Sequence, residues 1–268
     1  MENRIEKRMT HLRKTGGKSL SIVVMIGDPD LTTTFELLEI ALNVGVDVFE
    51  IGIPISNPVL DSRVMRESMN RALAFSSDYD WYLDVLGEMR AKFSEAAFEV
   101  MIYSETVEKI GLEKLCEALI KAQMDSVLVA DGVFKGQEYL RTLDDLLLPH
   151  GIFPIRFVPH PLDQRQFDDL KQNASGFMIV QTKTDAQGRR DSVLDENRNS
   201  IESIRQAGIH APIIFAYGIR TPEEARKCIS LGADGVLIGT VMLDTAYRLP
   251  RSKFIELLIS LRKAVAPV

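Results

Sequence analysis

Two acids, Glu50 and Asp61, stand eleven positions apart in a segment whose residue types suit proton transfer. Glu50 lies near the end of the apolar run Val46–Ile51, which is typical of a short buried strand. Asp61 follows a loop that contains one glycine and two prolines, residues that end a strand and prevent an immediate helix. A carboxyl group at a buried strand end is desolvated, so its pKa rises and it can carry protons near neutral pH. A second carboxylate on the facing loop could take the complementary role.

A simpler alternative gives both acids structural tasks. Glu50 could pair with a basic side chain, and Asp61 could cap a helix that begins near Ser62. Spacing alone favours this alternative, so the position of the two acids in the fold has to decide between the interpretations.

The elements that would position these acids alternate along the chain. Short apolar runs of strand character recur, and helical patterns lie between them. The predicted strands are Leu20–Ile26, Val46–Ile51, Phe98–Tyr103, Ser126–Ala130, Ile152–Phe157, Gly176–Gln181, Pro212–Phe215 and Gly235–Ile238. Eight nearly continuous apolar strands imply burial on both faces, which favours a closed (β/α)8 barrel over an open sheet. We expect residues 1–268 to form a single α/β domain of this TIM-barrel type.

The sequence predicts further helices in addition to those between the strands. Ile5–Leu12 precedes the first strand and would close the bottom of the barrel. Val241–Tyr247 suits an extra helix after strand eight, and Phe254–Ala264 reads as the final amphipathic helix. Tyr79–Phe93 looks like a helical elaboration after the second strand.

Barrel enzymes place their chemistry at the carboxyl ends of the strands, which strengthens the catalytic interpretation of Glu50 and Asp61. Tyr103 ends the third strand, and Asp131 follows the fourth, where it could line the pocket or cap the next helix. The polar, glycine-containing loop Thr182–Arg190, which includes Lys183, could be a lid over substrate or an ordinary surface loop.

The last two strands predict a phosphate site. Gly218 follows strand seven, and Gly239 and Thr240 follow strand eight at the start of a helix. Backbone N–H groups at a helix N-terminus, approached closely through glycines, bind phosphate oxygens well, and barrels commonly use this place. Alternatively, both glycines only permit tight turns.

Composition narrows the possible partners. A net charge of -6 argues against nucleic acid or anionic membranes as main partners. Four scattered histidines show no metal-ligand spacing, so we expect no metal site and no cofactor. Cys116 and Cys228 fall in helical patterns and should be apolar free thiols. Without a membrane-length apolar run or a signal peptide, we expect a cytoplasmic protein.

The chain resembles the tryptophan synthase α subunit family over nearly its whole length. The resemblance is carried by Gly27–Pro29, by the signature loop Phe49–Asp61, by the fourth strand Asp125–Asp131, and by Gly218 and Gly239 with their neighbours. Gly188 falls where the family's sixth loop also contributes a glycine. The signature loop is specific to the family, whereas the phosphate glycines occur in many related barrels.

This resemblance implies a lyase that cleaves indole-3-glycerol phosphate to indole and glyceraldehyde 3-phosphate by a retro-aldol reaction. Asp61 would hold the indole N–H, and Glu50 would carry protons to C3 and from the glycerol hydroxyl. Gly188, Gly218, Gly239 and Thr240 would hold the phosphate. The family also implies a β subunit as partner, contacted through the loops 54–58 and 182–190.

Several positions depart from the family pattern. Asn57 replaces an aspartate, Ser62 and Arg63 replace Gly-Pro, and Ile179 replaces a tyrosine, while the sixth loop keeps its length but not its chemistry. These changes leave two alternatives to the lyase: a catalytically weak chain that activates a β subunit, and a lyase or isomerase for another phosphorylated small molecule. Arg63 could meet an added negative charge on such a substrate.

Overall fold

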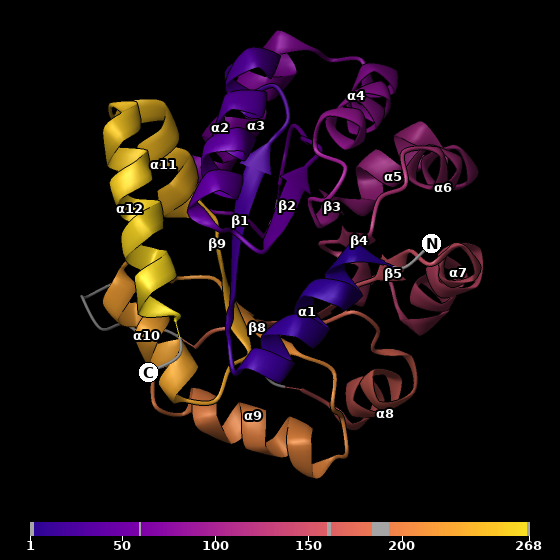
Figure 1. Ribbon diagram of the computed structural model, residues 1–268. Helices are drawn as coiled ribbons and strands as arrows, with labels where there is room; N and C mark the ends of the chain where they lie inside the picture. The colour runs from indigo at the N-terminus through magenta and orange to yellow at the C-terminus, as the bar shows by residue number, and fades with distance from the viewer. Residues whose placement is uncertain (1–2, 59, 160–161, 184–192, 267–268) are drawn as a thin grey trace.

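The computed structural model describes residues 3–58, 60–159, 162–183 and 193–266. It shows parallel strands surrounded by helices (Figure 1). In the described residues the strands are β1 Ser19–Met25, β2 Val48–Gly52, β3 Phe98–Ile102, β4 Ser126–Val129, β5 Phe153–Pro154, β6 Arg156–Val158, β7 Met178–Gln181, β8 Ile213–Ala216 and β9 Gly235–Ile238.

The sheet closes into a barrel at the fifth predicted strand. The strand order runs from β5 through β4, β3, β2, β1, β9, β8 and β7 to β6, so its two ends are consecutive in the chain. The predicted strand Ile152–Phe157 is split at Ile155, whose N–H donates to the Val127 carbonyl at 2.8 Å. The split follows Pro154, which has no backbone N–H to donate to a ladder. The predicted (β/α)8 barrel is confirmed, with its fifth strand in two pieces.

The predicted helices are present with small shifts at their ends. The described part of the chain contains α1 Arg4–Thr15, α2 Leu31–Val44, α3 Arg63–Phe75, α4 Tyr79–Lys92, α5 Ser104–Ile110, α6 Leu112–Lys121, α7 Gln137–Leu147, α8 Gln164–Asn173, α9 Asn197–Gln206, α10 Pro222–Ser230, α11 Thr240–Arg248 and α12 Arg251–Ala264, with the 3-10 turns η1 Gly132–Phe134 and η2 Leu148–His150. The N-terminal helix is α1, and α11 is the extra helix after the last strand.

Two apolar layers hold the barrel together. One lies between the strands and the outer helices, and Cys116 and Cys228 are buried in it as free thiols, as predicted. The other fills the barrel interior with side chains such as Met101 and Leu128. Ile5 and Met9 of α1 join this interior cluster, so the N-terminal helix does close one end of the barrel.

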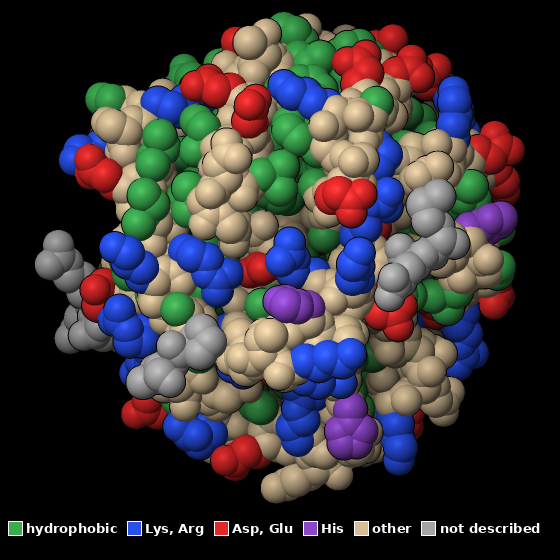
Figure 2. Space-filling view, viewed as in Figure 1, with side chains coloured by type: hydrophobic (Ala, Val, Ile, Leu, Met, Phe, Trp, Pro, Cys, Tyr) green, Lys and Arg blue, Asp and Glu red, His purple; other side chains and the backbone are tan. Residues whose placement is uncertain are grey.

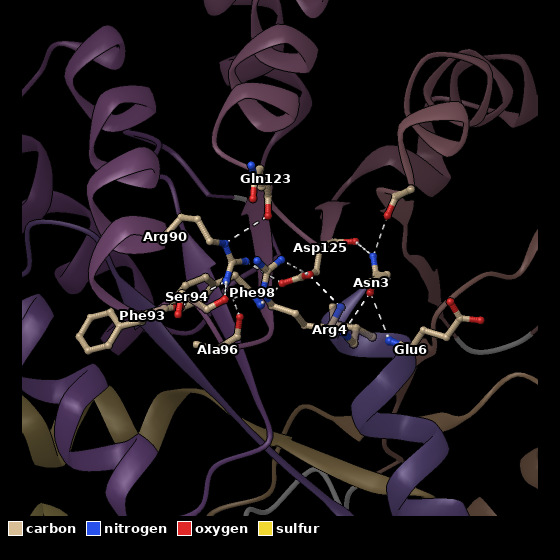
Figure 3. Close-up of polar contacts among 12 residues, drawn as sticks. Asn3, Arg4, Glu6, Arg90, Phe93, Ser94, Ala96, Phe98, Gln123 and Asp125 are labelled. Atoms are coloured by element: carbon tan, nitrogen blue, oxygen red, sulfur yellow. Dashed lines mark hydrogen bonds and ion pairs between the residues drawn. The ribbon is translucent and has the colours of Figure 1, made fainter. Parts of the chain in front are cut away.

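A polar network fixes α1 to the barrel (Figure 3). Asn3 Nδ2 donates to the backbone carbonyls of Asp125, at 2.6 Å, and Gly151, at 2.8 Å. The Asp125 carboxylate in turn accepts from the Arg4 backbone N–H at 3.0 Å and from the Arg90 guanidinium at 2.8 Å. The network therefore stabilises the closed end of the barrel.

The face that carries α1 is rich in charge. Figure 2 shows Lys and Arg side chains spread across the middle of this face, and α1 contributes Arg4, Lys7, Arg8, Arg13 and Lys14. No helix among the described residues is long and apolar enough to cross a membrane.

Candidate active site

A cavity of about 360 Å³ opens at the carboxyl ends of the strands. Strand-end residues from around the barrel form its wall, which is mainly apolar, as in most small-molecule sites. The residues of functional interest that line it are Glu50, Asp61, Ser62, Ile179, Tyr217, Gly218, Arg220, Gly239 and Thr240. The structure thus brings the two predicted acids and the glycines of the last two strands to one cavity.

Glu50 reaches this cavity from the middle of β2. Its Cα is paired with Val23 on β1 and with Glu99 on β3, and only 5% of the residue is exposed. Burial, with a smaller contribution from the Asp61 charge, raises the pKa of Glu50 to about 8. Within the described residues no ion pair engages Glu50, so the alternative of a basic partner does not hold. A carboxyl group with this pKa is mostly protonated at neutral pH and can donate a proton.

Asp61 approaches from the loop after β2 and is held by Tyr103. The Tyr103 hydroxyl, at the end of β3, donates to Asp61 Oδ2 at 2.6 Å. Burial raises the pKa of Asp61, while the hydrogen bond from Tyr103 and the charge of Arg66 oppose that rise and favour the carboxylate. The helix α3 is capped by Ser62, whose Oγ accepts from the Met65 N–H at 3.3 Å. Asp61 is therefore free of the capping task that sequence spacing suggested.

Another part of the cavity wall comes from the turns after β8 and β9. Gly218 has a left-handed backbone, φ 75°, which a residue without a Cβ adopts without strain. Gly239 is the N-cap residue of α11, and Thr240 begins that helix. The first N–H groups of a helix have no partner inside the helix and attract anions. Thr240 Oγ1 lies 3.0 Å from Ser62 Oγ, which links this part of the wall to the loop that carries Asp61.

Several predicted residues do not line the cavity. Tyr103 meets the site only through Asp61, and the others lie elsewhere or outside the described chain. The Asp131 carboxylate accepts from the N–H and hydroxyl of Ser104 at the start of α5, so it braces a neighbouring helix and does not line the cavity. Lys183 is bound through its backbone to the Asn197 side chain. Gly188 falls outside the described residues, as does most of the predicted lid. Arg63 is largely exposed and pairs with Glu67 at 3.7 Å.

Tyr217, Arg220 and Glu99 are absent from the set of site residues that sequence reasoning selected. Tyr217 has a left-handed φ of 72° although it is not glycine, and its pKa is raised by burial and by the nearby Asp61 and Glu50 carboxyls. Backbone strain of this kind often accompanies functional sites. Alternation along β3 could have revealed Glu99, because it lies four residues before Tyr103 and therefore on the same side of the strand.

Among the described residues, no group of three or more potential metal ligands is close enough to hold an ion. The polar residues that line the cavity are Glu50, Asp61, Ser62, Tyr217, Arg220 and Thr240.

Fold and site together define a (β/α)8 barrel with two acids and two glycine turns around one cavity at the carboxyl ends of its strands. A model of the tryptophan synthase alpha chain family matches residues 9–259. The chain belongs to this family.

Known members of the family are distant in sequence and close in fold. The chain is 29% identical to the tryptophan synthase alpha chain of Caldanaerobacter subterraneus subsp. tengcongensis over 245 residues, which cover 90% of each chain. It is 29% identical to that of Methanoregula boonei over 230 residues, covering 85% of this chain and 84% of the relative. The crystal structure of tryptophan synthase subunit alpha from Legionella pneumophila str. Paris superposes with a TM-score of 0.85 at 25% identity over 99% of both chains. A structure from Aquifex aeolicus VF5 shares the fold, with a TM-score of 0.87 at 22% identity over all of both chains.

Proposed function

We propose that the chain cleaves indole-3-glycerol phosphate to indole and glyceraldehyde 3-phosphate. The observation that carries this proposal is the position of Glu50 and Asp61, which line one cavity with Gly218, Gly239 and Thr240. One side of the cavity can then hold the indole ring between the acids, while the other side binds the phosphate. Family membership supports the same reaction.

The protonation states of the two acids suit the two halves of the reaction. Glu50 begins as a carboxylic acid and gives its proton to indole C3. The Asp61 carboxylate, oriented by Tyr103, accepts a hydrogen bond from the indole N–H and stabilises the positive charge that spreads over the protonated ring.

In the second half of the reaction, Glu50 regains a proton from the substrate. The Glu50 carboxylate takes the proton from the hydroxyl on the glycerol carbon that is attached to C3. The bond between this carbon and C3 breaks, its electron pair returns to the ring, and the carbon becomes the aldehyde of glyceraldehyde 3-phosphate. Glu50 ends as the acid with which it began, so one residue performs both transfers.

The proposed phosphate ligands are backbone N–H groups. The backbone amides near Gly239 and Thr240, at the N-terminus of α11, are placed to bind phosphate oxygens. Apolar side chains such as Leu128 and Ile179 also line the cavity and suit an indole ring. Gly188 stays a predicted phosphate ligand from the family resemblance.

Indole release from indole-3-glycerol phosphate tests the proposal. We expect indole to form with the purified chain, with or without a β subunit, and to fall by about a thousandfold or more in Glu50→Gln, which keeps the size of the side chain but cannot exchange protons. Glu113→Gln, an exposed acid on α6, is the matched control and should keep full activity. If no indole forms under either condition, the proposed substrate is wrong.

A second candidate is a lyase or isomerase for a different phosphorylated small molecule. Arg220 lines the cavity beside Gly218, where it could meet the phosphate of such a substrate as well. Turnover of other phosphorylated substrates by the wild type, with loss in Glu50→Gln, would favour this candidate.

A β subunit remains the proposed protein partner. If the chain mainly activates a β subunit, Glu50→Gln should keep that activation while indole release is lost. Measuring the β reaction with wild-type and Glu50→Gln chains therefore separates a signalling role from catalysis.

A further inference from the structure

Another acid, Glu99, is buried beside Glu50 and has no role in the proposed reaction. Glu99 on β3 is the Cα partner of Glu50 on β2, and Ser126 on β4 is the Cα partner of Glu99. Residues in register on neighbouring parallel strands point to the same side of the sheet. Glu50, Glu99 and Ser126 therefore form a row of polar side chains inside the barrel, which we call the interior polar row.

The interior polar row is buried and incompletely bonded. Glu99 is 1% exposed and Ser126 is fully buried. Within the described residues, Glu99 Oε1 and Ser126 Oγ have no hydrogen-bond partner. A buried carboxylate without a cation is costly, so Glu99 is expected to keep its proton. Burial and the neighbouring Glu50 raise the pKa of Glu99 well above its ordinary value, which agrees with this state.

Glu50 has few other polar neighbours. Asp61 faces it from the loop after β2, and Tyr217 faces it from the turn after β8. On its other side β1 presents the apolar Val23. A protonated Glu99 has one hydroxyl to donate, and the Glu50 carboxylate is the neighbouring acceptor that gains most from it.

We propose that Glu99 is a positioning residue for Glu50: a neutral carboxylic acid that donates a hydrogen bond to the Glu50 carboxylate and so sets how tightly Glu50 holds its proton. The inference rests on the proposed function, in which Glu50 becomes a carboxylate after protonating C3. At that moment its charge is far from bulk water, and the Glu99 hydroxyl stabilises it. Without this donor, Glu50 holds its proton more tightly and releases it to substrate less readily.

Two variants separate the donor from the rest of the side chain. Glu99→Gln keeps an N–H donor at the same place, whereas Glu99→Met has a similar length and no donor. Infrared spectra of the ligand-free chain, recorded from pH 5 to pH 10, would follow the protonated carboxyl band of Glu50, identified by its loss in Glu50→Gln. Loss of a hydrogen bond to a charged group should raise the Glu50 midpoint by about one pH unit or more in Glu99→Met, and Glu99→Gln should stay within about half a unit of wild type.

The same spectra test the charge state of Glu99. Glu99→Gln should remove one protonated carboxyl band at pH 7. The inference is overturned if no such band is lost, or if the Glu50 midpoint in Glu99→Met equals that of wild type. Glu99→Leu serves as a second donor-free variant in case Glu99→Met does not fold.

The spectra need no substrate, so they separate this inference from the proposed function. A shifted midpoint in a chain that releases no indole would support the acid pair and reject the substrate. Normal indole release with an unshifted midpoint would reject the pair and support the substrate. If the chain releases indole and the midpoint shifts, the pH at which indole turnover is half-maximal should move in Glu99→Met by the same amount as the infrared midpoint.

Discussion

Tyr103 and Asp61 join two neighbouring strand ends through a hydrogen bond of 2.6 Å, in which the phenol donates to the carboxylate. The bond fixes a loop acid against a barrel strand, and Tyr103 is itself almost fully buried. The Tyr103 hydroxyl also lies 3.4 Å from the Leu60 N–H, which donates to it. The loop that carries Asp61 is thus positioned by one side chain through both its backbone and its acid.

Tyr103→Phe should therefore reduce turnover more than stability. The substitution keeps the ring and removes a hydrogen bond to a charged group, which contributes about 1.5–3 kcal/mol, so we expect indole release to fall by about tenfold to a hundredfold. Turnover and urea unfolding of the variant check this. Tyr79→Phe, on the exterior helix α4, is the control and should leave turnover unchanged. Unchanged turnover in Tyr103→Phe would show that Asp61 needs no orientation by the phenol.

The raised pKa of Glu50 also predicts a pH dependence of stability. The folded chain keeps the Glu50 proton up to about pH 8, whereas the unfolded chain releases it near the ordinary value of 4.5. Between these values the folded state binds more protons, so the free energy of unfolding falls as pH rises, by at most about 1.4 kcal/mol per pH unit from this group.

Glu50→Gln removes this contribution. The variant and wild type should have similar stability near pH 4, and the variant should become the more stable chain as pH rises toward 8. Urea unfolding at several pH values measures the difference, which is independent of any substrate. A constant difference across the range would mean that Glu50 ionises at its ordinary pKa in the folded chain.

Stability at the other end of the barrel should depend on Asp125. Its buried carboxylate accepts from the Arg90 guanidinium at 2.8 Å and from the Phe98 N–H at 2.9 Å, and Arg4 adds a further contact. Asp125→Ala leaves a buried arginine without its partner, so we expect a loss of about 3–5 kcal/mol in the free energy of unfolding.

The Asp125→Ala substitution should lower stability without lowering catalytic activity. At a temperature where Asp125→Ala is folded, its kcat/KM should remain within about twofold of wild type, because the network lies at the α1 end of the barrel (Figure 3). Asp145→Ala, an exposed acid on α7, is the stability control. A large drop in kcat/KM of the folded Asp125→Ala chain would contradict a purely structural role.

The sequence predicts the barrel well because apolar runs and turn residues are local signals. The eight strands, the helix α1 and the helix α11 all follow from them. The split of the fifth strand depends on where Pro154 meets its neighbours, which no local pattern encodes. The capping of α3 by Ser62, and not Asp61, likewise depends on the partner that each side chain finds, and for Asp61 this is Tyr103, 42 positions away.

The site is only partly predictable for the same reason. Spacing identifies Glu50, Asp61 and the strand-end glycines as candidates, and a rule about barrels places them at one end. The pairing of Glu50 with Glu99 needs the register between β2 and β3, which is set by the closed sheet. Asp131 also follows a strand, but its partner could not be read from the sequence: its carboxylate accepts hydrogen bonds from Ser104.

Arg220 should contribute to substrate affinity. It is exposed at the cavity rim next to Gly218, and its backbone N–H donates to the Glu224 carboxylate at 2.7 Å, which fixes the start of α10. An arginine at this place can form charge-assisted hydrogen bonds to phosphate, although solvent screening limits their strength. Arg220→Gln should raise KM for indole-3-glycerol phosphate by about fivefold to tenfold and leave kcat nearly unchanged, because the interaction is the same in the ground and transition states.

Steady-state kinetics at low and high salt check this prediction. The gap in KM between wild type and Arg220→Gln should narrow as salt rises, since screening weakens exposed charge pairs. Arg226→Gln, an exposed position on α10 that does not line the cavity, loses the same charge and should behave as wild type. Indole-3-glycerol without the phosphate should be turned over equally by wild type and Arg220→Gln. An unchanged KM would place Arg220 outside the phosphate site and leave the backbone amides after β8 and β9 as the phosphate ligands.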